Sequence, residues 1–318
     1  MFESLRDLNV RIDRDSLRVR RPGHSVFLCG GLISKKADDK AVLSVRDYLY
    51  RVRQAEKRLG ATVVLAETAQ QLYRDTSYSD LISFEEDIAR LASIVLVISE
   101  SPGSLAELGA FASEPVIRDT LRIVISEDHS LAESFVRFGP IKRIENINRS
   151  HIGIFPWKTH KSNGLVVKAS VMPHFKEIVS FIKDRIDEIP LSLSYLALSD
   201  EKARFFDILW LIGLLEPAPP ERLYDAVRII YPDMTDAHIR NCLYTLRVCR
   251  WIATFSYSGR DYFYLPVTQD PFEYAFLPGQ RPRDVAVHKL SIVTEFHRTV
   301  SISKAVIKRL QDKRKGLA

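Results

Sequence analysis

The strongest constraint on the fold is a series of short apolar runs, rich in Val and Ile, that contain no polar alternation. They occupy residues 25–31, 61–67, 93–98 and 121–127. Runs of this kind are typical of strands in a parallel sheet that is buried on both faces. Helical patterns separate them, as in residues 41–59, 103–113 and 130–139, and "IGIF" at 152–155 is a candidate last strand. The alternation predicts a doubly wound α/β fold over residues 22–160.

A different pattern begins near residue 195. Three helical patterns cover 199–215, 219–232 and 235–252, and two aromatic, β-rich segments around Ser258-Gly259 follow them. Three helices and a β-ribbon predict a C-terminal winged helix-turn-helix domain. We therefore expect four parts, which are a basic N-terminal arm (1–24), an α/β catalytic domain (25–190), a winged-helix domain (195–270) and a basic C-terminal tail (271–318).

Positive charge is concentrated at the two ends of the chain. Residues 281–318 hold ten basic and three acidic side chains, although the net charge of the whole chain is only +6. A second basic cluster precedes the first strand, at Arg14, Arg18, Arg20 and Arg21. Such clusters are either solvated surfaces or contact surfaces for phosphate-rich partners, and a DNA-binding fold nearby favours the second interpretation.

The cysteines and the hydropathy of the chain indicate the cellular compartment in which we expect the protein. The three cysteines lack the spacing of a disulfide framework or a zinc site, and the eight histidines lack metal-ligand spacing. No apolar run approaches the roughly 18 residues of a membrane span. The charged N-terminus has no signal-peptide character. We expect a cytoplasmic protein with no metal and no membrane contact.

The predicted ligand site lies at the carboxyl ends of the strands, where open α/β sheets bind their ligands. Candidate substrate-binding residues there are Cys29, Gly30, Gly31, Glu67 and the loop that includes Ser101, Pro102, Gly103 and Ser104. Gly103 allows close approach of a ligand, and free N–H groups at the start of the following helix suit an anion.

Glu107 follows this loop and has two interpretations. Ser104 and Glu107 match the capping box S-x-x-E, which gives Glu107 a structural role. Alternatively, Glu107 is a carboxylate nucleophile for glycosyl transfer, kept ionised by the helix dipole. Glu85 has a similar ambiguity, since it is either a cap partner for Ser83, in a helix that extends through Leu91, or a ligand contact. Cys29 is either a structural thiol or part of the site.

Three stretches, "FLCGG" (27–31), "LISFEEDIARLASIVLVISESPGSLAELGAF" (81–111) and "SFVRFGP" (134–140), resemble the nucleoside 2-deoxyribosyltransferase-like domain of retron effector proteins. In that family the domain precedes a winged-helix DNA-binding domain. The resemblance implies that Glu107 is the nucleophile and that Gly30, Gly31, Pro102, Gly103 and Ser104 line a nucleotide site. It also implies that Glu67 and Glu85 hold ribose hydroxyls or shape the pocket.

The resemblance further implies a toxin-like role in anti-phage defence. The substrate would be a nucleotide, with NAD as the leading choice and no cofactor. A retron reverse transcriptase with its msDNA and msrRNA would restrain the enzyme, and a homo-oligomer is expected. Transferases acting on free nucleosides usually carry an aspartate six residues before the nucleophile, where this chain has Ser101. Exchange between free bases is therefore not expected, whereas hydrolysis of a nucleotide is.

Nucleic-acid contacts are expected in the C-terminal part. Arg240, Tyr244 and Arg247 share one face of the third helical pattern, and Arg260 lies at the turn of the ribbon. The tail adds Lys308, Arg309, Lys313, Arg314 and Lys315. The same residues would also suit a solvated or protein-binding surface.

Two other functions remain open at this point. A nucleoside-monophosphate phosphoribohydrolase has a similar loop, but its usual "PGG-x-GT-x-x-E" differs from "SPGSLAE", which lacks the second glycine and the threonine. A nucleotide-sensing winged-helix regulator would need Glu107 only for binding or capping.

Overall fold

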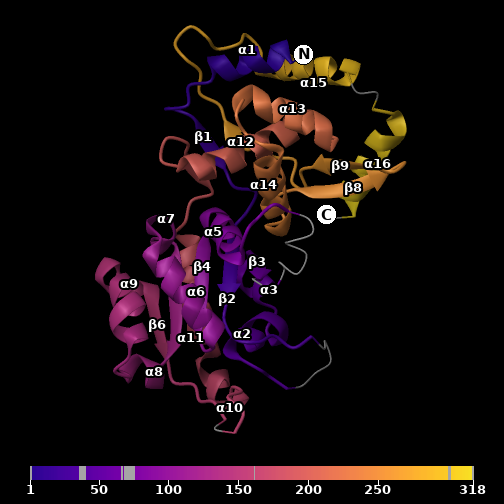
Figure 1. The fold of residues 1–318 in the computed structure, drawn as a ribbon. Helices are drawn as coiled ribbons and strands as arrows, with labels where there is room; N and C mark the ends of the chain where they lie inside the picture. The colour runs from indigo at the N-terminus through magenta and orange to yellow at the C-terminus, as the bar shows by residue number, and fades with distance from the viewer. Residues whose placement is uncertain are drawn as a thin grey trace. The chain divides into compact units, whose positions relative to one another are not determined.

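The computed structural model describes residues 2–35, 41–65, 67, 76–160, 162–299 and 302–316. The chain forms two compact units (Figure 1). The α/β unit consists of Gly23–Gln71 and Asp80–Pro190, and the C-terminal unit consists of Met1–Pro22, Leu72–Ser79 and Leu191–Ala318.

The α/β unit is built on a five-stranded sheet in which every pair of neighbouring strands is parallel. Its spatial order is β3-β2-β4-β5-β6. In chain order the strands are β2 (Ser25–Cys29), β3 (Thr62–Leu65), β4 (Ile94–Ser99), β5 (Leu121–Ser126) and β6 (Ile152–Phe155). The chain winds outward from β2 in both directions, so that the topological switch point lies between β2 and β4. The predicted parallel α/β sheet is confirmed.

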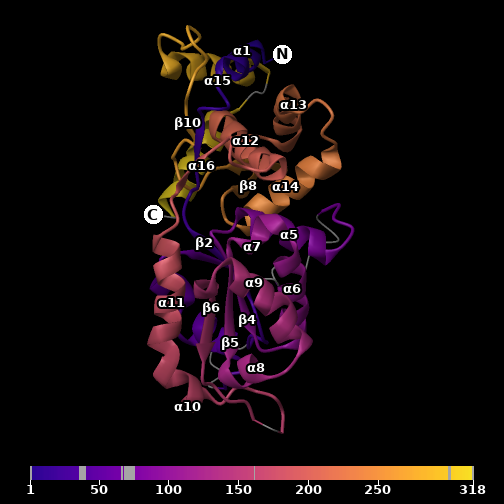
Figure 2. The same ribbon diagram turned by 90° about the vertical axis from the view of Figure 1, so that its left-hand side faces the viewer.

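Helices cover the two faces of this sheet (Figure 2). They are α2 (Val45–Asp47), the π-helix η1 (Tyr48–Val52), α3 (Ala55–Leu59), α5 (Leu81–Leu91), α6 (Pro102–Ser113), α7 (Pro115–Arg118), α8 (Glu127–Leu131), the π-helix η3 (Arg137–Ile141), α9 (Lys142–Ile147), the 3-10 helices η4 (Arg149–His151) and η5 (Met172–His174), α10 (Lys168–Val171) and α11 (Phe175–Asp187).

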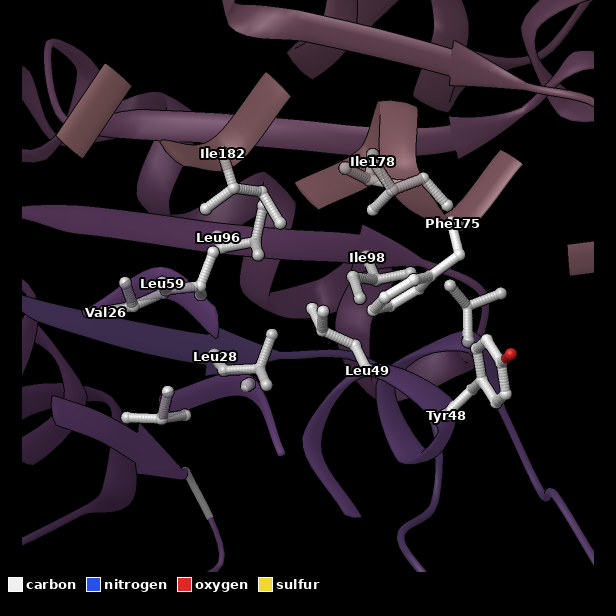
Figure 3. Close-up of a cluster of buried hydrophobic side chains, with 14 of the residues drawn as sticks. Val26, Leu28, Tyr48, Leu49, Leu59, Leu96, Ile98, Phe175, Ile178 and Ile182 are labelled. Atoms are coloured by element: carbon white, nitrogen blue, oxygen red, sulfur yellow. The ribbon is translucent and has the colours of Figure 1, made fainter. Parts of the chain in front are cut away.

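Alternate strand residues serve the two faces. Leu28 of β2 and Leu96 of β4 pack in a buried cluster with Ile182 of α11 (Figure 3). On the opposite face Phe27 meets Phe111 of α6 edge to face, with ring centroids 6.0 Å apart. Cys29 is two residues from Phe27 and therefore shares the face that α6 covers.

Two predicted helices differ from the structure. The pattern over 41–59 is broken into α2, η1 and α3, because Gln54 takes a left-handed conformation with φ of 53°. The pattern over 130–139 is also interrupted, since α8 ends at Leu131 and Ala132 is extended before η3 begins.

The C-terminal unit contains α12 (Asp200–Leu215), α13 (Pro220–Ile230) and α14 (Asp236–Val248), followed by an antiparallel hairpin of β8 (Ala253–Tyr257) and β9 (Arg260–Tyr264). Ser199 caps α12 and Thr235 caps α14, while Pro220 begins α13. Three helices and a hairpin therefore occur in the predicted order (Figure 1).

The sequence predicted a separate N-terminal arm and a separate C-terminal tail. In the structure both ends of the chain are instead part of the C-terminal unit. β1 (Arg18–Arg20) is the central strand of a small antiparallel sheet, between β7 (Ser192–Ser194) and β10 (Phe272–Glu273). α1 (Glu3–Arg11) packs against α15 (Val285–Thr299). Apolar residues explain this correction, because Leu5, Leu8 and Phe296 are fully buried beneath the charged side chains.

The final helix, α16 (Lys304–Lys315), also packs within the C-terminal unit. Val306 and Leu310 join Phe255, Tyr262 and Tyr264 of the hairpin in one apolar cluster. One face of this helix in the basic tail therefore packs against the hairpin. No helix among the described residues is long and apolar enough to cross a bilayer.

Candidate active site

The carboxylate of the half-buried Glu100 joins the two strands at the switch point. Glu100, immediately after β4, accepts hydrogen bonds from the backbone N–H groups of Gly31 (3.0 Å), Val45 (2.7 Å) and Arg46 (3.0 Å). These bonds fix the loop after β2 and the start of α2 against the end of β4. With three amide donors, Glu100 has a structural role beside the site.

The two glycines after β2 are required by this close packing. A Cβ on Gly31 would lie 2.6 Å from Cβ of Ser44, and one on Gly30 would lie 2.9 Å from Cδ of Arg46. The sequence predicted that these glycines line a nucleotide site. The structure places them at the expected strand end and explains their lack of a side chain by protein contacts.

The start of α6 is capped differently from the sequence prediction. Ser101 is the N-cap, and its hydroxyl accepts from the backbone N–H of Ser104 while donating to the carbonyl of Gly30 (both 3.2 Å). The Ser104 hydroxyl accepts from the backbone N–H of Ser101 at 3.0 Å, which completes the capping box. Pro102 begins the helix, so Glu107 lies in its second turn and cannot be the cap partner.

The fold provides hydrogen-bond partners for only part of the Glu107 carboxylate. The Cys29 thiol, which is fully buried, donates a hydrogen bond to it. The other carboxylate oxygen, Oε2, is buried and has no hydrogen-bond partner among the described residues. Burial raises the pKa of Glu107 to about 7, opposed by the positive charge of Arg46. The expected ionisation by the helix dipole is thus outweighed, since the dipole acts mainly within the first turn.

Glu85 is the second unusual carboxyl group. It lies on α5 with 6% of its surface exposed, and burial together with the charge of Glu107 raises its pKa to about 8. The cap of α5 is Asp80, which accepts from the backbone N–H of Ser83 at 2.8 Å. The predicted capping role of Ser83, with Glu85 as its partner, is therefore wrong. At neutral pH Glu85 keeps its proton while Glu107 is partly ionised.

Arg46 organises the acidic residues, and sequence reasoning missed it. Its guanidinium is 3% exposed and binds both carboxylate oxygens of Glu67 at 2.5 Å. It also donates to the carbonyl of Gly31 at 3.3 Å and lowers the pKa of both Glu85 and Glu107. The available signal was an arginine within the apolar helical pattern "AVLSVRDYLYRV", where a buried charge requires acidic partners.

The four side chains Glu67, Glu85, Glu107 and Arg46, with Cys29 beneath Glu107, are thus coupled to one another at the switch point. Pro102 and Gly103 are exposed at the start of α6 and have no role in this charge cluster. Such a cluster contains two carboxyl groups with differently raised pKa values, and glycosyl transfer uses a pair of carboxyl groups in different protonation states. No three His, Cys, Asp or Glu side chains among the described residues are placed so that they could hold a metal ion.

The predicted nucleic-acid residues fall into two groups in the C-terminal unit. Arg240, Arg247, Lys308, Arg309, Lys313 and Lys315 are exposed. The others are engaged by the fold. Arg260 forms an ion pair with Glu221, Arg314 pairs with Glu216 and donates to the Leu265 carbonyl, and Tyr244 is buried beneath the guanidinium of Arg247.

Together, the parallel sheet and the acidic cluster at its switch point define an α/β protein with a candidate ligand site of perturbed carboxyl groups. Comparison with known proteins gives a family. The chain belongs to the STM3845 retron effector protein family, whose profile matches residues 42–254.

Two curated relatives from Escherichia coli carry the description "putative ribosyltransferase/DNA-binding protein". The retron Ec73 protein is 31% identical over 131 residues, which is 40% of this chain and 40% of that protein. The retron Ec86 protein is 23% identical over 128 residues, or 40% of this chain and 39% of that protein. Each match therefore spans about two fifths of the relative's length.

Proposed function

We propose that this retron effector cleaves the N-glycosidic bond of a nucleotide, with NAD as the leading substrate and Glu107 as the nucleophile. The observation that carries the proposal is the buried oxygen of Glu107 that has no hydrogen-bond partner among the described residues. The charge of Glu107, together with burial, raises the pKa of Glu85. The ribosyltransferase description of the two relatives supports the same class of chemistry. NAD enters as a substrate, and the reaction needs no further cofactor.

In the proposed reaction a Glu107 oxygen bonds to the anomeric carbon of the ribose as the bond to the base breaks. The bonding electron pair leaves with the base, through an oxocarbenium-like transition state. Water then attacks the same carbon, the bond to Glu107 breaks, and a carboxylate accepts the proton from water. Glu67 and Arg46 hold the site together by their bidentate ion pair.

The requirement for the proton of Glu85 should differ between two kinds of substrate. Nicotinamide leaves NAD as a neutral molecule and needs no proton, whereas an adenine leaving from AMP must be protonated. The proton of Glu85 is available for that second case at pH values below about 8. Loss of Glu85 should therefore impair release of adenine more than release of nicotinamide.

We further propose that the C-terminal unit is a winged-helix domain that contacts nucleic acid through Arg240, Arg247 and the exposed lysines of α16. The DNA-binding description of the relatives supports this assignment. A retron reverse transcriptase with its msDNA and msrRNA would be the partner that restrains the enzyme, in a homo-oligomeric assembly in the cytoplasm.

The test is chromatography of reaction mixtures that contain NAD, AMP, ATP or dATP, with and without the co-expressed retron complex. Wild type should release nicotinamide or a free base, and Glu107→Gln should release neither. Glu114→Gln, which changes the residue directly after α6, is the matched control and should retain activity. If wild type binds nucleotide but never releases a base, a nucleotide-sensing regulator explains the site better.

A further inference from the structure

The stretch "SFVRFGP" (134–140) places two phenylalanines on the surface of the α/β unit. Phe135 has 86% of its surface exposed, and Phe138 has 66%. Both belong to the helical segment that leads into η3, where residues three apart are neighbours. The tip of the Phe135 ring rests over Gly139, since a Cβ built there would lie 3.4 Å from Cζ of Phe135. The fold therefore presents two adjacent aromatic rings to solvent.

The two rings border a cavity of about 500 Å³. Its other walls come from the end of α6, from α7 and from α9, which all belong to the α/β unit. Cavities that bind ligands have volumes of about 300–1,000 Å³. The exposed rings are thus part of a hollow with several walls, in contrast to the scattered apolar side chains that every protein surface carries.

Positive charge surrounds the rings. Arg118, Lys142 and Arg143 line the cavity, and no acidic side chain among the described residues lines it with them. Glu145 pairs with Lys142 at 2.9 Å and with Arg137 at 3.3 Å. Neither Arg118 nor Arg143 forms an ion pair within the described part of the chain. These two guanidinium groups are therefore available to an anionic ligand.

The combination of rings and cations indicates the kind of ligand. A second copy of the same face would bring like charges together. The cores of protein interfaces are depleted in charged side chains, lysine above all, whereas three cations stand among these rings. Exposed aromatic rings with cations between them are instead the surface on which unpaired bases stack while their phosphates are bound. A duplex offers phosphates to the same cations, but its bases are already stacked on one another.

We propose that Phe135 and Phe138 form a stacking platform for single-stranded nucleic acid on the α/β unit, with Arg118 and Arg143 binding the phosphates beside it. This platform lies in a different unit from the nucleic-acid contacts proposed above, and it does not depend on the glycosidase reaction. Binding should tolerate changes of sequence, because every base has a face that can stack.

A fluorophore attached at residue 146 reports binding in this cavity. Asn146 is exposed and lines the cavity, and the three native cysteines are buried, so Asn146→Cys can be labelled selectively in the full-length protein. The probes are oligo(dT) and a duplex of the same length. We expect oligo(dT) to change the fluorescence, with binding about tenfold weaker in Phe135→Leu and less than about twofold weaker in Phe135→Tyr, which keeps the ring. Ile82→Ala, which shortens an exposed apolar side chain outside the cavity, is the control and should bind as the labelled parent does.

The inference is overturned if oligo(dT) leaves the fluorescence unchanged, or if Phe135→Leu binds it as tightly as the labelled parent. Equal binding of the duplex would also overturn it, since the cations alone would then explain the affinity. Fluorescence that depends on protein concentration without DNA, and loses this dependence in Phe135→Leu, would assign the surface to a second copy of the chain instead.

Discussion

Each unit contains buried acidic side chains, and the two units differ in how fully these side chains are hydrogen-bonded. In the C-terminal unit Asp207 is fully buried and accepts hydrogen bonds from Arg14 (2.5 Å), Tyr195 (2.8 Å) and Tyr231. In the α/β unit Glu85 and Glu107 share the field of one arginine, and one oxygen of Glu107 has no partner among the described residues. The hydrogen-bonding capacity of Asp207 is therefore satisfied, whereas that of Glu107 is not.

The difference indicates what each group is for. A buried charge with good partners holds elements together, and here Asp207 fixes the N-terminal segment to α12 and α13. An unsatisfied buried carboxyl group costs stability, so a fold retains it where a ligand or a reaction uses it. The contrast is therefore a reason to assign the chemistry to Glu107 and Glu85.

The strongest test of this comparison is to neutralise one acidic residue in each unit. Asp207→Asn should lower the free energy of unfolding by about 3 kcal/mol, because Arg14 loses its buried partner. Glu107→Gln should leave stability unchanged or raised at pH 8 while base release falls at least about 10³-fold. Denaturant unfolding and chromatography measure the two effects. Equal destabilisation by both substitutions would contradict the distinction.

Glu85→Gln tests the second acid through pH. The folded-state pKa of Glu85, about 8, lies above its ordinary value of 4.5, so its protonated form stabilises the fold. That stabilisation is present below pH 4.5 and is lost as pH rises through 8. At pH 9 the variant should be more stable than wild type by about 5 kcal/mol, since the pKa rises from 4.5 to about 8 and one pKa unit equals about 1.4 kcal/mol. Unfolding at pH 5 and pH 9 provides the measurement.

The neighbouring Glu86→Gln is the control, because Glu86 pairs with Arg90 on the same helix. It should show no comparable gain at pH 9. A wild type whose stability does not fall relative to Glu85→Gln between pH 5 and 9 would show that Glu85 is not strained.

We expect Arg46 to set the pH range of the proposed activity. Release of adenine from AMP by wild type should follow a bell, rising near pH 7 as Glu107 ionises and falling near pH 8 as Glu85 loses its proton, whereas release of nicotinamide from NAD should show the rising limb alone. Arg46→Met removes the charge that lowers both pKa values, so both limbs should move upward by about one pH unit, while Arg46→Lys should move them less. A pH–rate profile that is identical in Arg46→Met and wild type would contradict the electrostatic role of Arg46.

The smallest expected effect contrasts paired and unpaired arginines in the C-terminal unit. Arg240 is exposed, with no ion-pair partner among the described residues, whereas Arg260 is paired with Glu221. Arg240→Ala should lower the slope of log K against log salt for a DNA hairpin by about 1, and Arg260→Ala should change it less. Binding titrations at several salt concentrations measure both slopes. A larger change for Arg260 would show that its ion pair opens on binding.

Much of the fold could be predicted because its signals are local. The unalternated runs at β2, β4 and β5 are strands, and the hairpin turns at Ser258-Gly259 as expected. Ser199 and Thr235 cap the helices that begin where the sequence placed them. A candidate site at this edge of the sheet could be predicted for the same reason, since parallel strands bring their carboxyl ends to one edge.

What the sequence could not provide depends on contacts distant along the chain. The cap of α6 is Ser101 rather than Ser104, because Pro102 fixes the first helical position. The buried Arg46, 61 residues before Glu107, is recognised as part of the site only when both are placed together. The pairing of β1 with β10 has the same origin, since it joins opposite ends of the chain.

The central claim is that Glu107 forms a covalent bond to the sugar, and mass spectrometry of trapped protein tests it most directly. Wild type would be incubated with 2′-deoxy-2′-fluoroarabino analogues of NAD and AMP, which slow release of the glycosyl-enzyme. The account predicts one added glycosyl mass, located on the peptide that contains Glu107 and absent in Glu107→Gln. A protein that releases base from these analogues without any adduct, or with the adduct on another residue, would contradict the account.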